Sequence, residues 1–198
     1  MVTSVFRIAV LFSILLPGLA FSKISVDVNQ RFAKLQENMN YIYVLMASAL
    51  VFLMQAGFMC LESGMCRAKN SINIAIKNLC DFIIAIGAFW LIGFGLMFGD
   101  SLGGMLGSSE FAFGTATAWV ALFFVFQAVF CGTAATIQSG VIAERTSFAA
   151  YLMISLIVSM LIYPIFGHWA WGSFLNGEGP GWLEKLGFID FLVLHLKM

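Results

Sequence analysis

Charged residues are scarce in this sequence. Aspartate, glutamate, lysine and arginine together make up 10% of the 198 residues, whereas apolar residues make up 61%. A soluble domain carries about 25% charged residues, so this composition excludes a soluble globular domain and predicts an integral membrane protein. The mean hydropathy of +0.97 agrees with that prediction. Ten basic residues balance ten acidic ones, so the net charge gives no indication of a nucleic-acid partner.

The residue types that build catalytic and metal sites are also few. The sequence has two histidines, His168 and His195, and no Ser-His-Asp or Cys-His arrangement is indicated at a common depth. Gly93-Phe94-Gly95 falls inside an apolar stretch rather than after a strand, so no nucleotide site is indicated. Four cysteines lack metal-ligand spacing and are interpreted as packing residues (Cys60, Cys66, Cys80 and Cys131). We therefore predict no enzyme activity, no metal site and no cofactor.

Long uncharged runs are what the sequence does contain. Residues 111–143 and 146–177 carry no charge, and only Glu144 and Arg145 separate them. Each run exceeds the ~20 residues that a helix needs to cross a bilayer, so the charged pair is predicted to be a turn between two spans. Four complete spans are predicted in all, followed by an incomplete fifth that opens at Gly187. The four cover residues 41–61, 79–98, 118–140 and 148–167.

The first 22 residues have the order of a secretory signal peptide. Arg7 precedes an apolar run over residues 8–16, and a break at Pro17-Gly18 follows. The apolar core of such a signal is about 7 to 15 residues long, which is too short to span comfortably. We predict removal of residues 1–22, and the alternative is a retained signal anchor.

Charge placement predicts the orientation in the membrane. Residues 23–40 have apolar side chains at helical spacing, which favours an amphipathic helix on the outer surface. The loop after the first span is assigned Arg67, Lys69 and Lys77, whereas the loop over residues 100–117 has no lysine or arginine. Basic loops face the cytoplasm, so the N-terminus is predicted to lie outside. The expected location is the plasma membrane.

Aromatic residues mark the outer half of the third and fourth spans. Phe126 and Phe130 lie four residues apart and therefore share one helix face. Trp169 and Trp171 close the next span at its outer end. Aromatic rings attract small cations through their negative faces, with about 0.5 to 2 kcal/mol per contact. The pattern indicates a cation site at the membrane surface.

Small residues form a second stripe on the third span. Gly132, Thr136, Ser139 and Ala143 are spaced by four, three and four residues. Small side chains let helix backbones approach closely in lipid, so this stripe is predicted to contact other helices. It lies partly away from Phe126, which leaves the aromatic face free.

Several ordered motifs resemble the ammonium transporter family (Amt/Mep/Rh). The motifs lie within residues 41–191 and read QAGFMCLESGMCRAKN, IKN, FQAVF, SGVIAERTSF, GHWAWG and IDF in chain order. The resemblance implies a channel-like transporter, a homotrimer with one pore per subunit, built from two inverted halves of five helices and a final helix. The fold expected here is an all-α integral membrane protein that forms half of this inverted repeat. Its truncated transporter domain would cover residues 23–198.

The resemblance also implies site residues. Phe126 and Trp171 match the outer site that recruits ammonium, Phe130 matches the phenylalanine gate, and Asp190 matches an acidic residue that organises the recruitment region. Alternative interpretations exist for three of them. Phe130 could face lipid or pack, Trp171 could belong to an interfacial belt, and Asp190 could cap the fifth helix.

The histidines depart from the family pattern. The first pore histidine of the family lies eight residues after the matched Asp190, and Met198 stands there. His195 is only five residues past Asp190, so it points in a different direction on a helix, and the pore role is not transferred to it. His168 lies at the outer end of a span and is interpreted as an interfacial or packing residue.

Three functions are compatible with the sequence. The first is transport of ammonium, ammonia or methylammonium across a lipid bilayer. The second is a sensor or regulatory subunit that keeps the outer site. The third is a truncated, transport-inactive product that either does nothing or disturbs trimers of full-length homologues.

Overall fold

The computed structural model describes residues 2–112, 117–142, 144–175, 177 and 179–188, with side chains from Asp27 onward. The chain divides into two units, Met1–Tyr43 and Val44–Met198, and each is described by itself. The first unit is the N-terminal part of helix α1. In it Asp27 and Arg31 form an exposed ion pair one helical turn apart, with 3.1 Å between Oδ2 and Nε.

Helix α1 runs without interruption from Val2 to Met65. The predicted break at Pro17-Gly18 is therefore wrong, because the helical backbone continues through both residues. A proline removes one backbone hydrogen bond, and this helix continues despite that loss. The signal peptide over residues 1–22 stays a prediction.

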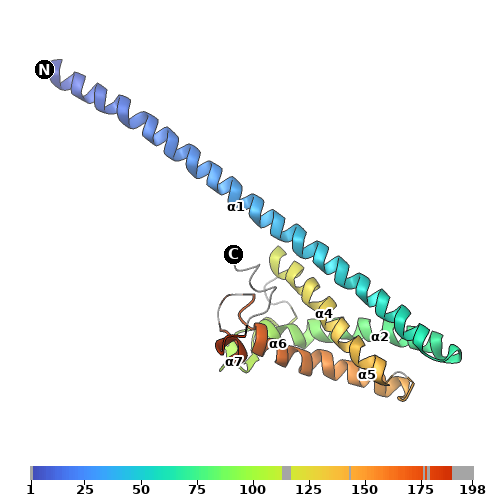
Figure 1. Ribbon diagram of the computed structural model, residues 1–198. Helices are drawn as coiled ribbons and strands as arrows, with labels where there is room; N and C mark the ends of the chain where they lie inside the picture. Colours follow the sequence, from blue (N-terminus) through green and yellow to red (C-terminus); the bar gives the residue numbers. More distant parts are fainter. Residues whose placement is uncertain (1, 113–116, 143, 176, 178, 189–198) are drawn as a thin grey trace. The chain divides into compact units, whose positions relative to one another are not determined.

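The second unit is built from helices (Figure 1). After α1 come η1 (Ala68–Asn70), α2 (Ser71–Ala88), η2 (Phe89–Gly93), α3 (Phe94–Phe98), α4 (Ala118–Ile142), α5 (Phe148–Ile157), η3 (Val158–Ile162), α6 (Tyr163–Trp171) and α7 (Trp182–Lys185). A small antiparallel hairpin, β1 (Ser101–Leu102) and β2 (Leu106–Gly107), joins α3 to α4 and pairs Ser101 with Gly107. Helix α2 packs against both α4 and α5.

Four helical segments of the described chain are long and apolar enough to cross a membrane. They are Asp27–Met65, Ala68–Phe98, Ala118–Ile142 and Phe148–Trp171. The predicted turn at Glu144-Arg145 is confirmed, because α4 ends at Ile142 and Ser147 caps α5 by accepting a hydrogen bond from the backbone N–H of Ala150. The protein is an all-α, multi-pass membrane protein. The predicted fifth span lies almost entirely outside the described residues.

Lys77 is not in a loop, and that part of the prediction is wrong. It lies inside α2 and is buried. Its Nζ donates a hydrogen bond to the carbonyl oxygen of Thr146 (3.0 Å) and lies 5.5 Å from the centre of the Tyr151 ring. A carbonyl and an aromatic face together compensate an ammonium group that leaves water, so the helix begins earlier than its charge pattern indicates.

Two π-helical turns, η2 and η3, pack against each other in the second unit. At the meeting point Gly93 lies against η3, and a Cβ there would come within 2.7 Å of the carbonyl oxygen of Ser159. A backbone carbonyl has little freedom to move, so the close approach of these two turns requires glycine at position 93.

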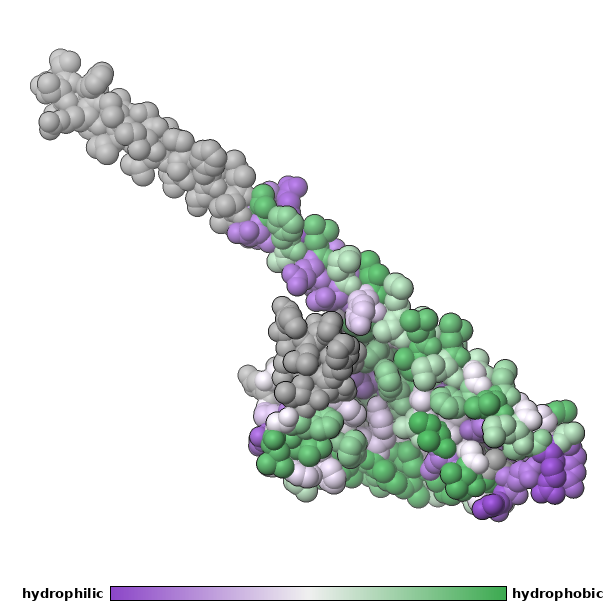
Figure 2. All heavy atoms as spheres, in the orientation of Figure 1, coloured by the Kyte–Doolittle hydropathy of each residue, from purple (hydrophilic) through white to green (hydrophobic). Residues whose placement is uncertain are grey.

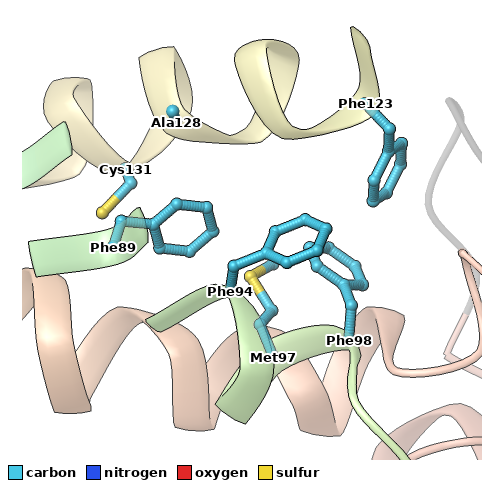
Figure 3. Packing of buried hydrophobic residues seen from close by; sticks show 7 residues of the cluster. All are labelled: Phe89, Phe94, Met97, Phe98, Phe123, Ala128 and Cys131. Atoms are coloured by element: carbon cyan, nitrogen blue, oxygen red, sulfur yellow. The ribbon is translucent and has the colours of Figure 1, made fainter. Parts of the chain in front are cut away.

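The apolar core lies between α4 and the segment from η2 to α3 (Figure 3). Rings dominate it. Phe94 lies 5.4 Å from Phe98 and 6.4 Å from Phe123, measured between ring centroids. Met97, Ala128 and Cys131 fill the remaining space. Because lipid is as apolar as these side chains, close packing rather than water exclusion holds the helices together here.

Hydrophobic residues cover much of the visible surface of the second unit, whereas hydrophilic residues gather at one end (Figure 2). That end is where α1 leads into α2 and where α4 leads into α5. Side chains such as Leu50, Ile83 and Val141 are more than half exposed. Such an apolar surface is the one that lipid requires.

Candidate functional site

The aromatic pair of α4 is the first part of the candidate site. The rings of Phe126 and Phe130 lie edge to face, 4.9 Å apart and at 66°. Helical spacing of four residues places one above the other. The Phe126 side chain is buried, with 5% exposed, whereas Phe130 is 37% exposed. The pair therefore presents an accessible ring backed by a buried one.

Trp171 lies apart from this pair. It ends α6, packs partly buried against the apolar core, and makes an edge-to-face contact with Phe166 at 6.2 Å. Among the described residues no ring contact joins Trp171 to Phe126. The structure thus brings Phe126 and Phe130 together and leaves Trp171 on another helix, α6. Asp190 lies outside the described residues.

The neighbouring tryptophan has a structural role. The indole Nε1 of Trp169 donates a hydrogen bond to the carbonyl oxygen of Met105 (2.9 Å), and its ring lies 5.7 Å from that of Trp182. It therefore ties α6 to the segment between the hairpin strands and to α7. A ring that is fixed in this way differs from the accessible ring of Phe130.

His168 is a packing residue, as its position in the sequence indicates. It is fully buried, with Nδ1 2.9 Å from the carbonyl oxygen of Met97 and Nε2 2.9 Å from the hydroxyl of Ser101. Because a carbonyl can only accept, Nδ1 carries the proton, and Nε2 accepts from the serine. His168 thereby joins α6 to α3 and β1. His195 lies outside the described residues.

A buried polar network is the feature that the sequence interpretation missed. Asn78 is at its centre: its Nδ2 donates to Oε2 of Glu62 (3.0 Å), and its Oδ1 accepts from Ser139 (3.1 Å) and from the hydroxyl of Tyr151 (3.2 Å). The Ser139 hydroxyl also lies within hydrogen-bond distance of Glu62 Oε2. One side chain of α2 thus binds α1, α4 and α5.

A second polar layer surrounds Asp81, which is fully buried. The hydroxyl of Thr136 donates to Asp81 Oδ2 (3.1 Å), and Ser155 contacts Oδ1. The side-chain amide of Gln55 reaches Thr136. The predicted contact role of the small stripe is therefore confirmed for Thr136, as it is for Ser139. Ala143 lies outside the described residues.

Helical spacing is the signal that could have revealed these two layers. The polar side chains of α1, Gln55 and Glu62, are seven residues apart, and those of α2, Asn78 and Asp81, are three apart. Each pair therefore falls on one helix face. A polar stripe inside an apolar span predicts helix contacts, because an unpaired polar group in lipid is costly.

At the polar end of the second unit, Glu144 binds the segment that joins α1 to α2. Its Oε1 accepts from the backbone N–H of Arg67 and from Asn70 Nδ2, both at 3.1 Å. Its Oε2 lies 3.1 Å from Nε and 3.0 Å from an outer nitrogen of the Arg67 guanidinium. The hydrogen bond from the Arg67 side chain, followed by those from Asn70 and the backbone, lowers the pKa of Glu144 from 4.5 to about 2.

Acidification is expected to release this contact. The folded pKa of Glu144 lies below its ordinary value, so the contact stabilises at pH above about 4.5 and is lost as pH falls towards about 2. Protection of the Arg67 amide against hydrogen exchange should therefore decline over that interval. In Glu144→Gln the protection should be weaker than in the wild type above about pH 4.5 and should not change with pH. A wild-type amide whose protection is constant from pH 5 to 2 would contradict this expectation.

Comparisons with known proteins agree on one family. A sequence profile of the Ammonium Transporter Family matches residues 42–194. A protein of Synechocystis sp., provisionally named an ammonium transporter, is 53% identical over 155 residues, which cover 76% of this chain and 29% of the relative. Ammonium transporter Amt2 of Archaeoglobus fulgidus is 44% identical over 153 residues, covering 76% of this chain and 31% of the relative.

A solved structure, that of a protein named Sensor Amt Protein, superimposes with a TM-score of 0.73 and 45% identity. The match covers 78% of this chain and 39% of that one. The chain thus spans about a third of the length of the curated relatives it matches.

Proposed function

The chain belongs to the ammonium transporter family, and on that premise we propose that it carries ammonium or ammonia across a membrane. Members of this family are channels or transporters, which confirms the prediction that the chain is not an enzyme. In the proposed mechanism Phe126 and Trp171 recruit the cation and Phe130 forms the gate. Asp190 would support the recruitment region.

The observation that carries this proposal is the edge-to-face pair of Phe126 and Phe130. It combines a buried and an accessible ring on one face of an apolar helix. A ring face attracts a cation without a fixed charge, so the ion is attracted but not trapped. Trp171 would add a second aromatic surface from α6.

An apolar path beyond the rings would determine whether nitrogen passes as ammonium or as ammonia. An ammonium ion is costly to place in an apolar channel, whereas neutral ammonia is not. Passage as neutral ammonia would therefore avoid most of the electrostatic cost. The aromatic pair would then act where the charge is still present.

The setting of the protein is part of the same proposal. We expect a homotrimer or an assembly with full-length homologues in the plasma membrane, with the N-terminus outside once residues 1–22 are removed. The basic residues Arg67 and Lys69 lie at the polar end of the second unit, which supports placing that end in the cytoplasm.

Ammonium-evoked current of the full chain in liposomes tests the recruitment site. Trp171→Leu and Phe126→Leu remove a ring and keep an apolar side chain. Each lost cation–π contact contributes about 0.5 to 2 kcal/mol, so the ammonium concentration at half-maximal current should rise about 2- to 30-fold. Trp171→Phe, which keeps a ring, should stay close to the wild type.

Trp90→Leu is the matched control for this experiment. Trp90 lies in η2 with an exposed side chain, and its replacement should leave the half-maximal concentration unchanged. The gate is tested separately, because Phe130→Ala should lower the ratio of ammonium current to potassium current. Saturation curves that coincide for Trp171→Leu, Phe126→Leu and the wild type would refute recruitment by these rings.

A sensor is the second candidate function, since the superimposed relative carries that name. A sensor needs the recruitment site but not the flux. Ammonium that quenches the fluorescence of folded chains in a Trp171-dependent manner, without any current, would favour this function over transport.

A further inference from the structure

One face of α4 connects the aromatic pair with the opposite end of the helix. Phe126, Phe130, Thr133, Ile137 and Gly140 follow one another at spacings of four, three, four and three residues. That spacing keeps all five within one face, and at ~1.5 Å per residue the face is about 21 Å long. A ligand bound at Phe126 and a ligand bound at Gly140 would therefore lie on the same face of α4.

A cavity of about 380 Å³ opens at the Gly140 end of this face, between α1 and α4. Phe58, Glu62 and Cys66 line it from α1 and the residue that follows, and Ile137 and Gly140 line it from α4. Its wall is apolar except for the carboxylate and the thiol. The cavity lies wholly within the second unit.

Glu62 places one carboxylate oxygen on the cavity side. The side chain is only 9% exposed, and its Oε2 is held by Asn78 and Ser139. None of the residues that the structure describes donates a hydrogen bond to Oε1. Oε1 lies 3.7 Å from the position that a Cβ on Gly140 would take, so it faces the part of α4 that lines the cavity.

An acidic side chain inside a membrane span is expensive, so each of its oxygens needs a partner or a function. The network around Asn78 uses only one oxygen of Glu62, so helix packing does not account for the other. We propose that this oxygen and the ring of Phe58 bind a monovalent cation of the ammonium class, with ammonium and methylammonium as its members. The inference rests on the proposed function and adds a second cation site, at the far end of the α4 face.

The composition of the cavity favours this class of ligand. A single carboxylate balances one positive charge, whereas calcium takes six to eight oxygen ligands and magnesium an octahedral set. Apolar walls and an aromatic ring suit a weakly hydrated alkylammonium ion. The cavity has room for such an ion together with water.

Cys66 is a reporter for occupancy of this cavity. Burial, Glu144 and Glu62 raise the pKa of its thiol, so labelling with neutral methyl methanethiosulfonate is carried out in mildly alkaline buffer. Cys60→Ala and Cys80→Ala remove the other accessible thiols, and Cys131 is buried. The full chain is labelled in maltoside micelles with methylammonium chloride or, at equal ionic strength, sodium chloride.

Methylammonium is expected to slow Cys66 labelling about threefold when its concentration is twice its dissociation constant. The effect should vanish in Glu62→Gln. It should weaken in Gly140→Ala, whose methyl group would lie against Oε1. Gly57→Ala is the matched control on α1, because a Cβ there meets nothing within 4 Å, and it should keep the full effect.

The inference is overturned if the folded wild-type chain shows no slowing, or if the slowing persists unchanged in both Glu62→Gln and Gly140→Ala. Circular dichroism establishes whether each variant is folded. If Glu62→Gln is unfolded, Gly140→Ala alone tests the inference. A lipid amine is the other source of ammonium chemistry. Protection by a short-chain phosphatidylethanolamine but not by methylammonium would assign the cavity to a lipid headgroup and also overturn the inference.

This experiment separates the inference from the proposed function. Trp171→Leu should leave the protection of Cys66 unchanged, because the two sites lie at opposite ends of the second unit. Protection of Cys66 without ammonium current would support the cation site at Glu62 and count against transport. Current without protection would support transport and refute the site at Glu62.

Discussion

Replacing Asn78 by aspartate is expected to lower the free energy of unfolding by about 3 kcal/mol. The change exchanges one N–H₂ group for an oxygen of similar size. The Nδ2 atom that it removes donates to Oε2 of Glu62 over 3.0 Å, so two carboxylates would face each other in its place. A hydrogen bond to a charged group contributes about 1.5 to 3 kcal/mol, and repulsion between the carboxylates adds to its loss. Unfolding in mixed micelles, followed by circular dichroism, measures the difference.

Asn38→Asp is the matched control for this prediction. Asn38 lies on α1 with an exposed side chain, so the same chemical change should leave the unfolding midpoint close to that of the wild type. If Asn78→Asp and Asn38→Asp had the same unfolding midpoint, the Asn78 network would not stabilise the four helices that it joins.

Phe94→Ala is expected to destabilise the second unit by about 2 kcal/mol, which is the contribution of the cavity that the ring leaves. Phe94 is 1% exposed, and its ring contacts those of Phe89, Phe98 and Phe123. In lipid the transfer contribution is small, but the empty volume left by the ring still removes its dispersion contacts. Thermal unfolding in detergent should show a midpoint well below that of the wild type.

Phe148→Ala tests whether this effect depends on packing. Phe148 begins α5 and is exposed, so the same truncation leaves no cavity there and should change the midpoint little. Equal destabilisation by both variants would mean that the ring cluster contributes no more than a lipid-facing ring, contrary to this expectation.

The spans were predictable because a bilayer imposes a length on every apolar run. Residues 111–143 and 146–177 can be read in this way without knowledge of tertiary contacts, and the turn at Glu144 follows from them. The start of α2 could not be predicted from the apolar runs. Lys77 looks like a loop residue until the carbonyl of Thr146 and the ring of Tyr151, 69 and 74 positions away in the chain, are placed beside it.

The contact within the aromatic pair could likewise be predicted from the sequence, whereas the contacts of the polar network could not. Phe126 and Phe130 are neighbours on one helix, so their contact follows from spacing alone. The partners of Glu62 and Asn78 come from separate helices, and only the packing of α1, α2 and α4 selects which polar groups meet. The roles of Phe126, Trp171 and Phe130 in transport remain predictions for the experiments above.

The two π-helical turns have a consequence for insertions and deletions. A π turn corresponds to one extra residue in an α-helix, absorbed within a single turn. Loss of one residue other than Gly93 within Phe89–Gly93 would convert η2 to a regular turn and leave the flanking helices nearly in phase. The same loss one turn earlier, in α2, would rotate all preceding side chains relative to the core by about 100°. A one-residue deletion is therefore tolerated best where the helix already holds an extra residue.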